Sequence, residues 1–275
     1  HAADYFVNDA STNGDVYCSA IGSDAHAGTN AAAPKLTLAN LLASLDLEPG
    51  DRVYIDTGSY SNFTASINSG STGASGDPVS FVGSTNAAMG TKLYPTSGST
   101  GLTLYDGVQW LLFEHLTIID GGMGIRIENG CNNQVFRDVT VRNTTGVPSV
   151  GYRAGISINN ADYLLFEGCC VTRNRYGIYI QGGTAGNVLW ENGVVLNNST
   201  MGISNPRGMN FRNSVFSDGV LFGGTGPSGA GEYNVFWNGV FHDSTAYGTL
   251  SEFEAAVGWS NNVYADPQFA DPANY

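Results

Sequence analysis

The chain has 275 residues and a formal net charge of −13, with 13% charged residues and 37 glycines. This length allows one large core, and so many glycines are typical of short strands joined by tight turns rather than of a helical bundle. The sequence has no basic tract to neutralise phosphates and no apolar run long enough to cross a bilayer, which excludes nucleic acid and membrane insertion as expected modes of action.

The first predicted element is a helix within residues 34–47, because its leucines fall on one helical face. These leucines are Leu38, Leu41, Leu42 and Leu45. We expect the helix to close the N-terminal end of the fold, where unpaired strand edges would promote aggregation. The sequence DRVYID at 51–56 then predicts the first strand of the first coil.

A two-strand pattern repeats from residue 101 onward. The first strand reads Gly, apolar, any, apolar, polar in GLTLY (101–105), GIRIE (124–128), GISIN (155–159), GIYIQ (177–181) and the shortened GISN (202–205). A second strand with a central aromatic follows each copy, and we interpret NVFWNGVF (234–241) as a further second strand. The aromatics, 21 to 30 residues apart, are Phe113, Phe136, Phe166, Trp190, Phe211 and Phe236. This period matches one coil of a parallel β-helix, with three strands and three turns.

Alignment of the repeats predicts side-chain columns at the strand spacing of about 4.8 Å. The aromatics form an inward stack, and the next residues (Glu114, Arg137, Glu167, Glu191 and Arg212) form an outward column in which opposite charges pair. The third column reads His115, Asp138, Gly168, Asn192, Asn213 and Asn238. Because Asn, Asp and Gly tolerate a left-handed backbone, this column predicts a tight turn. The predicted fold class is all-β: a right-handed parallel β-helix with three-strand coils.

Two short elements are expected after the coils. Ser251-Glu-Phe-Glu predicts a capping box that opens a helix ending near Val257, and residues 265–275 read as an extended tail. We therefore predict one domain over 1–275, with an N-terminal cap and first strand (1–60), coils (79–241) and a C-terminal cap and tail (249–275).

Four cysteines allow three full pairings, and the sequence does not choose between structural disulfides and buried free thiols. They are Cys18, Cys131, Cys169 and Cys170. The last two are adjacent and point to opposite faces of a strand, which makes a bond between them implausible. The chain begins at His1 with neither Met nor a signal-like apolar segment, as a processed or trimmed product would.

The two ends of the chain resemble secreted bacterial β-helix proteins of the pectate-lyase-like superfamily. The resemblance rests on YFVNDAST, GSDAHAGTN, PKLTL and LEPGDRVYIDTGSY near the start, and on LSEFEAAVG and VYADPQFADPANY at the end. It implies a secreted, extracellular or cell-surface protein with a polysaccharide partner and a substrate groove along the first strand of each coil. The paired-Asp and His-Gly motifs of the polygalacturonase-like hydrolases are absent from the sequence.

The outward residues of the first strands, and the loops that enter them, are therefore the candidate site. Substrate-binding residues are expected at Arg126, Tyr105, Ser157, Asn159 and Gln181, because guanidinium groups bind carboxylates in pairs and aromatic rings stack on sugars. Proton abstraction is assigned to Arg153, Arg175 or Tyr179, and a Ca²⁺ ion to Glu128 with Asp120. The inserted loop 142–155 enlarges this side of the solenoid. The alternative is a solvated ladder without function.

Two functions stay open at this point. One is an enzyme or binding protein for an extracellular, acidic polysaccharide, acting as a lyase by β-elimination rather than as a glycoside hydrolase if it is catalytic. The other is a non-catalytic structural module of a bacterial cell-surface or filament assembly, which would self-assemble or contact neighbouring modules of a larger chain. The residues alone do not decide whether the protein is an enzyme.

Overall fold

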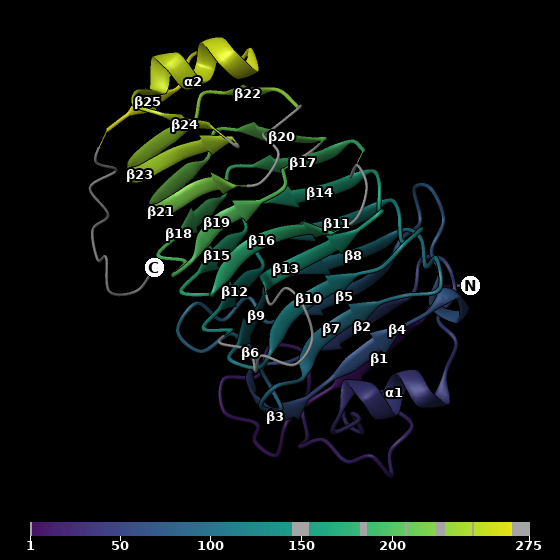
Figure 1. The fold of residues 1–275 in the computed structure, drawn as a ribbon. Coiled ribbons are helices and arrows are strands. Elements are labelled where there is room, and N and C mark those ends of the chain that lie inside the picture. The colour runs from purple at the N-terminus through teal and green to yellow at the C-terminus, as the bar shows by residue number, and fades with distance from the viewer. Residues whose placement is uncertain are drawn as a thin grey trace.

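The computed structural model describes residues 2–144, 154–181, 186–206, 208–223, 229–243 and 245–265. Its strands stack coil upon coil into a solenoid, with helix α1 (Leu38–Ser44) at the N-terminal end and α2 (Leu250–Val257) at the C-terminal end (Figure 1). Beyond Ala265, the predicted C-terminal tail lies outside the described residues. The predicted all-β, parallel β-helix fold is confirmed.

Three faces wind around the core. Sheet A has nine parallel strands: β1 (Asp4–Val7), β2 (Arg52–Ile55), β5 (Val79–Gly83), β8 (Leu111–Glu114), β11 (Gln134–Arg137), β14 (Leu164–Glu167), β17 (Val188–Glu191), β20 (Met209–Arg212) and β22 (Gly231–Glu232). The third-strand face contains β3 (Gly58–Phe63), β6 (Thr91–Pro95), β9 (Leu116–Ile119), β12 (Thr140–Arg142), β15 (Cys170–Thr172) and β18 (Val194–Leu196). The first-strand face contains β4 (Ala65–Ile67), β7 (Thr100–Leu104), β10 (Met123–Ile127), β13 (Ala154–Asn159), β16 (Tyr176–Gln181) and β19 (Met201–Ser204).

The third-strand and first-strand faces merge at the C-terminal end. Strand β21 (Val215–Gly223) pairs first with β18 and then with β19, which joins both faces into one sheet. Strand β23 (Val235–Asp243) lies along β21, followed by β24 (Thr245–Tyr247) and β25 (Val263–Tyr264). One 3₁₀ turn, Ser69–Ser71, lies near the N-terminal end.

The aromatic stack fills sheet A's side of the core. The rings of Phe113 and Phe136 lie 5.0 Å apart and those of Phe136 and Phe166 4.9 Å apart, as the repeat predicts. Phe81 adds one more ring at the N-terminal side. The placement of Phe236 in this stack is wrong: it pairs with Phe216 of β21, because residues 234–241 repeat the long β21 strand and not a second strand.

The left-handed turn column is confirmed for its five predicted coils from His115 to Asn213, whose φ angles lie between 49° and 65°. Asn238 is the exception, since it lies inside β23. Tyr233, with φ of 58°, takes the position instead, because it follows Glu232 of β22, which pairs with Arg212. The turn column thus continues beyond Asn213 by one coil, to the turn that follows β22, the last strand of sheet A.

Both caps are helical, with small corrections. Helix α1 is shorter than residues 34–47 and begins after Thr37, whose side chain accepts a hydrogen bond from the Asn40 N–H. Leu38 and Leu41 are buried, as a cap against the coils requires. Helix α2 has the predicted kind of capping box, but Thr249 and Glu252 form it rather than the Ser251 motif. Thr249 has the extended backbone that an N-cap needs.

All four cysteines are free thiols, which settles the choice between the two alternatives against disulfides. Burial raises the pKa of Cys169 to about 12 and that of Cys170 to about 11. Both groups therefore stay protonated at neutral pH, and we assign them a packing role.

Candidate functional site

The first-strand face carries two outward columns of polar side chains. Alternation along each strand buries one residue and presents the next, so that Ile125 and Ile127 lie in the core while Arg126 faces out. The column that we call the inner column contains Ser66, Thr103, Arg126, Ser157, Tyr179 and Ser204. The outer column, at the strand ends, contains Asn68, Tyr105, Glu128, Asn159 and Gln181.

Side chains are linked both between the two columns and, along the outer column, between neighbouring coils. Arg126 forms an ion pair with Glu128, and the Asn159 amide donates to the same carboxylate at 3.0 Å. The Asn68 amide donates to the Tyr105 hydroxyl at 3.2 Å. The charge of Arg126 is therefore balanced locally, and a ligand carboxylate would compete with Glu128 for it.

Accessibility divides the face into two parts. Tyr105 is 38% exposed and the Arg126 side chain 45% exposed, so β7 and β10 present their polar groups to solvent. Ser157 and Tyr179 point the same way from β13 and β16 but are buried. Asn159 and Gln181, at the ends of these two strands, are partly exposed.

Of the three predicted catalytic residues, the structure describes two. Arg153 lies outside the described residues. The exposed Arg175 guanidinium lies 5.7 Å from the ring centre of Tyr176, and that ring lies 6.4 Å from the ring of Tyr179. The structure thus brings Arg175 and Tyr179 into one row through Tyr176, a residue that the sequence patterns did not single out.

The predicted pair of Ca²⁺ ligands does not come together. Asp120 precedes β10 and Glu128 follows it, and at about 3.3 Å per residue the strand alone separates them by more than about 13 Å. One ion cannot bind both carboxylates at that separation. In the part of the chain that the structure describes, no three His, Cys, Asp or Glu side chains gather into a metal site.

An asparagine ladder supports the turns that lead into the first strands. Asn174 Oδ1 accepts from the Thr144 N–H at 3.0 Å, and Asn198 Oδ1 accepts from the Asn174 N–H at 3.0 Å. Asn174 and Asn198 are buried. This ladder was missed by the sequence patterns, although an Asn recurs after the third strands β15 and β18 and could have indicated it.

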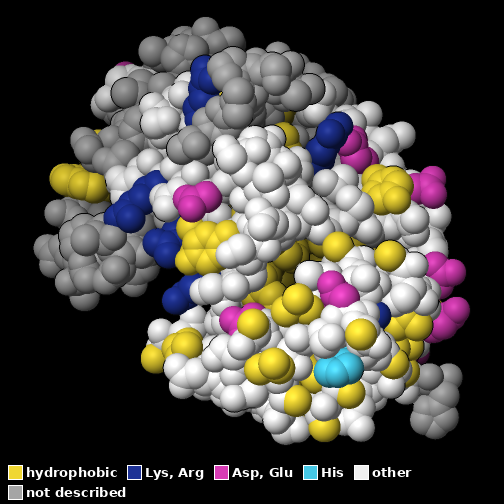
Figure 2. Space-filling model, turned by 90° about the horizontal axis from the view of Figure 1, so that it is seen from below, with side chains coloured by type: hydrophobic (Ala, Val, Ile, Leu, Met, Phe, Trp, Pro, Cys, Tyr) yellow, Lys and Arg dark blue, Asp and Glu magenta, His cyan; other side chains and the backbone are white. Residues whose placement is uncertain are grey.

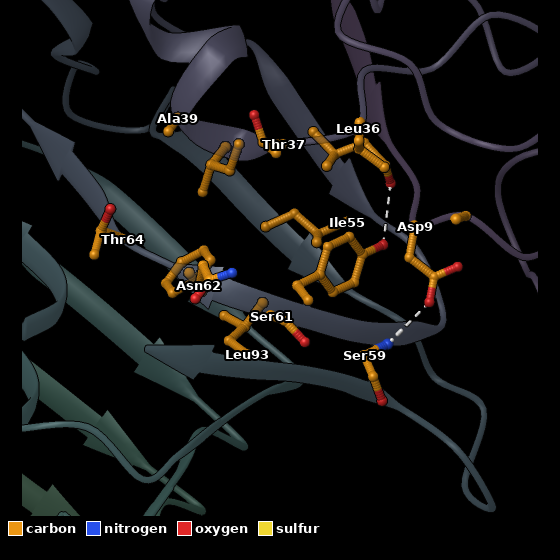
Figure 3. A pocket seen from close by; sticks show the side chains of 15 residues that line it. Asp9, Leu36, Thr37, Ala39, Ile55, Ser59, Ser61, Asn62, Thr64 and Leu93 are labelled. Atoms are coloured by element: carbon orange, nitrogen blue, oxygen red, sulfur yellow. Dashed lines mark hydrogen bonds between the residues drawn. The ribbon is translucent and has the colours of Figure 1, made fainter. Parts of the chain in front are cut away.

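A cavity of about 300 Å³ lies at the N-terminal end, between β3 and the start of α1 (Figure 3). Its lining comes from the segments around Val7, Leu36, Ile55, Tyr60 and Leu93. Since these segments are far apart in the sequence, no local pattern could have indicated the cavity. It is separate from the polar columns of the first-strand face, because none of their members lines it.

Comparison with known proteins supports the fold. Solved structures of similar shape include a GH136 lacto-N-biosidase from Eubacterium ramulus (TM-score 0.63, 15% identity, 86% of this chain and 52% of that one). They also include the pectate lyase Pel9A (TM-score 0.57, 14% identity, 88% and 71%) and an alginate lyase from Paenibacillus sp. str. FPU-7 (TM-score 0.53, 15% identity, 73% and 74%). The chain thus spans about half the length of the lacto-N-biosidase. At these identities the likeness establishes the fold alone.

No curated protein sequence matches the chain. None of the helices in the described ranges is long and apolar enough to cross a membrane. The family model described as a right handed beta helix region matches residues 83–239, more than half of the chain. The protein therefore belongs to the right-handed β-helix family.

Proposed function

We propose that this protein binds an extracellular polysaccharide along the first-strand face. The observation that carries the proposal is the pair of outward columns, in which each coil contributes polar side chains and in which Tyr105 and Arg126 are exposed to solvent. Polar groups about 4.8 Å apart from coil to coil offer a row of donors and acceptors to an extended polymer. The names of the structural neighbours, a pectate lyase, an alginate lyase and a lacto-N-biosidase, support a carbohydrate partner.

An acidic polysaccharide is the form of the ligand that we favour. Arg126 and Arg175 are exposed cations on or beside this face, and a guanidinium group binds a carboxylate through two parallel hydrogen bonds. Tyr105 adds an exposed ring, on which a sugar can stack.

If the face is catalytic, β-elimination is the reaction that its residues suit. A base would remove the proton next to the uronate carboxylate, a C=C bond would form, and the glycosidic C–O bond would break with proton uptake by the leaving oxygen. The pKa of an arginine side chain is too high for a base at neutral pH, so Arg175 would hold the carboxylate. Tyr179 would act as the base once the substrate displaces the groups that bury it. No step in this scheme uses a metal ion.

The test is a panel of acidic and neutral polysaccharides, assayed with and without Ca²⁺ for retention in affinity electrophoresis and for the ultraviolet absorbance of unsaturated uronates. We expect retention by an acidic polymer, and with a lyase a rising absorbance that Tyr179→Phe abolishes. Retention without absorbance would leave a binding protein. Absence of retention by every polymer would contradict the proposal.

A structural module is the second candidate, and one observation favours it. Trp237, Val263 and Tyr264 are 37%, 52% and 48% exposed at the C-terminal end, and the rings of Trp237 and Tyr264 lie 5.9 Å apart. Exposed apolar groups at the end of a solenoid suit contact with a second copy or a neighbouring module. Sedimentation velocity of the wild type and of Trp237→Ser would decide this: an assembly that the substitution dissolves supports the module, and a concentration-independent monomer contradicts it.

A further inference from the structure

Three strands meet the N-terminal end of the solenoid, and two of them are covered. The outer edge of β1 is paired with residues 28–35, since Phe6 N–H donates to Gly28 O at 2.7 Å and Asn8 N–H to Lys35 O at 2.9 Å. Helix α1 packs against β4. The outer edge of β3 has neither a strand nor a helix paired with it in the described chain. An open edge of this kind can accept a further strand.

The hydrogen-bond pattern between β3 and β6 shows which backbone groups of β3 face the open edge. Gly58 N–H donates to Gly90 O at 3.0 Å, toward the β6 side, so alternate residues Ser59 and Ser61 face the open edge. Ser59 N–H donates to Asp9 Oδ2 at 3.0 Å. The Ser59 carbonyl and both backbone groups of Ser61 have no hydrogen-bond partner among the residues that the structure describes. One donor and two acceptors are thus available along one edge.

The cavity of about 300 Å³ lies directly beside this edge (Figure 3). Ser59 and Ser61 form one wall, and Leu36 and Ala39 lie on the opposite side at the start of α1. The apolar groups Ile55 and Leu93 also line it. Figure 2, which shows the molecule from below, has hydrophobic side chains gathered in a hollow of this end. A strand edge facing a helix across an apolar cavity is the geometry of peptide recognition by strand addition.

A carboxylate stands at one end of the cavity without a cation. Asp9 accepts from the N–H groups of Ser59 and Ser11, and no Lys, Arg or His in the described ranges forms an ion pair with it. A Cβ at Gly58 would clash with this carboxylate, so the glycine makes room for it. The charge favours a ligand with a positive group at that end.

We propose that the edge of β3 binds an extended peptide as an additional strand. Backbone groups of the peptide pair with Ser59 and Ser61, one apolar side chain enters the cavity, and a Lys or Arg of the peptide approaches Asp9. This site is independent of the polysaccharide face. The free backbone groups of Ser59 and Ser61 are two residues apart, which is the period of a β-strand. They therefore favour a peptide over a sugar as the ligand.

The probe is a library of seven-residue peptides, labelled with fluorescein at the N-terminus and amidated at the C-terminus, with Phe, Leu, Val or Met at the centre, Lys at one neighbouring position or the other, and Thr elsewhere. Fluorescence anisotropy with the full chain should find members that bind saturably. Ala39→Trp fills the mouth of the cavity and should weaken binding at least about tenfold. Ala43→Trp, the same change one turn along α1 at an exposed position away from the cavity, should leave it unchanged.

A backbone substitution tests the edge itself. Ser61→Pro removes the outward N–H without touching the bonds to β6, and Pro is tolerated on the open side of an edge strand. We expect a loss of at least about tenfold, and full affinity for Ser61→Val, which keeps the N–H. If Ser61→Pro does not fold, the Ala39 and Ala43 pair decides alone. A library without a binder, binding that Ala39→Trp does not weaken, or binding that a neutral oligosaccharide displaces would overturn the proposal.

Discussion

Sheet A and the first-strand face are built by the same coils but differ on their outer surfaces. On sheet A the repeat extends outward: Arg137 bonds to Glu114 at 3.3 Å and to Glu167 at 2.9 Å, and Arg212 pairs with Glu191 at 3.4 Å. On the first-strand face only the inward residues repeat, while the inner column changes from Thr103 to Arg126 to Ser157. On sheet A both the inward and the outward residues repeat, so the outward residues pair with one another and stabilise the stack of coils. On the first-strand face the outward residues vary over a constant core, so they are available to contact a ligand.

The largest expected effect comes from the interior of sheet A. Phe136 is fully buried between Phe113 and Phe166, so Phe136→Ala should cost about 3–5 kcal/mol of unfolding free energy. Denaturant unfolding measures it, with Phe136→Leu as the milder control. A loss below about 1 kcal/mol would mean that the stack is not the main support of the coils.

The turn into the first strands should be the next most sensitive place. Asn174→Ala leaves the buried Thr144 N–H without its acceptor and should cost about 2–3 kcal/mol. Asn174→Asp keeps the acceptor but buries a charge and places a carboxylate oxygen where Nδ2 donates to Val141 O and Asn198 Oδ1, so it should cost at least as much in the same unfolding experiment. A loss below about 0.5 kcal/mol for Asn174→Ala would contradict a hydrogen-bonding role for the ladder.

On the first-strand face the effect should appear in binding instead of stability. Arg126→Ala removes an exposed guanidinium and should weaken an acidic polysaccharide about tenfold, or about 1.4 kcal/mol, with the melting temperature unchanged. Isothermal titration with an oligosaccharide gives the affinity. A variant that binds as tightly as the wild type would remove Arg126 from the site.

The buried thiol of Cys169 should make stability depend on alkaline pH. Burial raises its pKa from 9.0 to about 12, so its contribution is complete below pH 9 and is lost as the pH rises toward 12. We expect a loss of about 1 kcal/mol between pH 9 and pH 10. In Cys169→Ala the unfolding free energy should fall less over this interval, and an unchanged slope would contradict the assignment.

The smallest effect is expected on the outside of sheet A. Arg137 is 44% exposed, so Arg137→Ala should cost less than about 1 kcal/mol, and less still in high salt. Polysaccharide affinity should not change, which makes this variant the matched control for Arg126→Ala. Weaker binding by Arg137→Ala would break the distinction between the two faces.

The sequence predicts the coils well because several columns agree. The aromatic, the charged residue after it and the turn residue after that recur together, so each confirms the register of the others. The agreement ends at Phe236, because β21 and β23 are long strands that each run across two faces, so that residues 234–241 align with β21 and not with the strands of sheet A. A short repeated pattern does not show where two faces join into one sheet.

The candidate site is less predictable than the coils, for a geometric reason. The repeat places Tyr105, Arg126 and Asn159 on one face correctly, since alternation decides which side chains point outward. It cannot place Asp120, because a strand separates that residue from Glu128. The cavity beside β3 depends on contacts between Val7, Leu36 and Leu93, which no pattern of 20 to 30 residues connects.

The most direct test of the central claim is hydroxyl-radical footprinting with and without a bound acidic polysaccharide. Tyr105, on the first-strand face, is 38% exposed, while Tyr163 and Tyr233, on turns beside sheet A, are 61% and 56% exposed and serve as internal controls. We predict that the ligand lowers oxidation of Tyr105 and leaves Tyr163 and Tyr233 unchanged. Protection of Tyr163 or Tyr233 with no change at Tyr105 would contradict the assignment of the binding face.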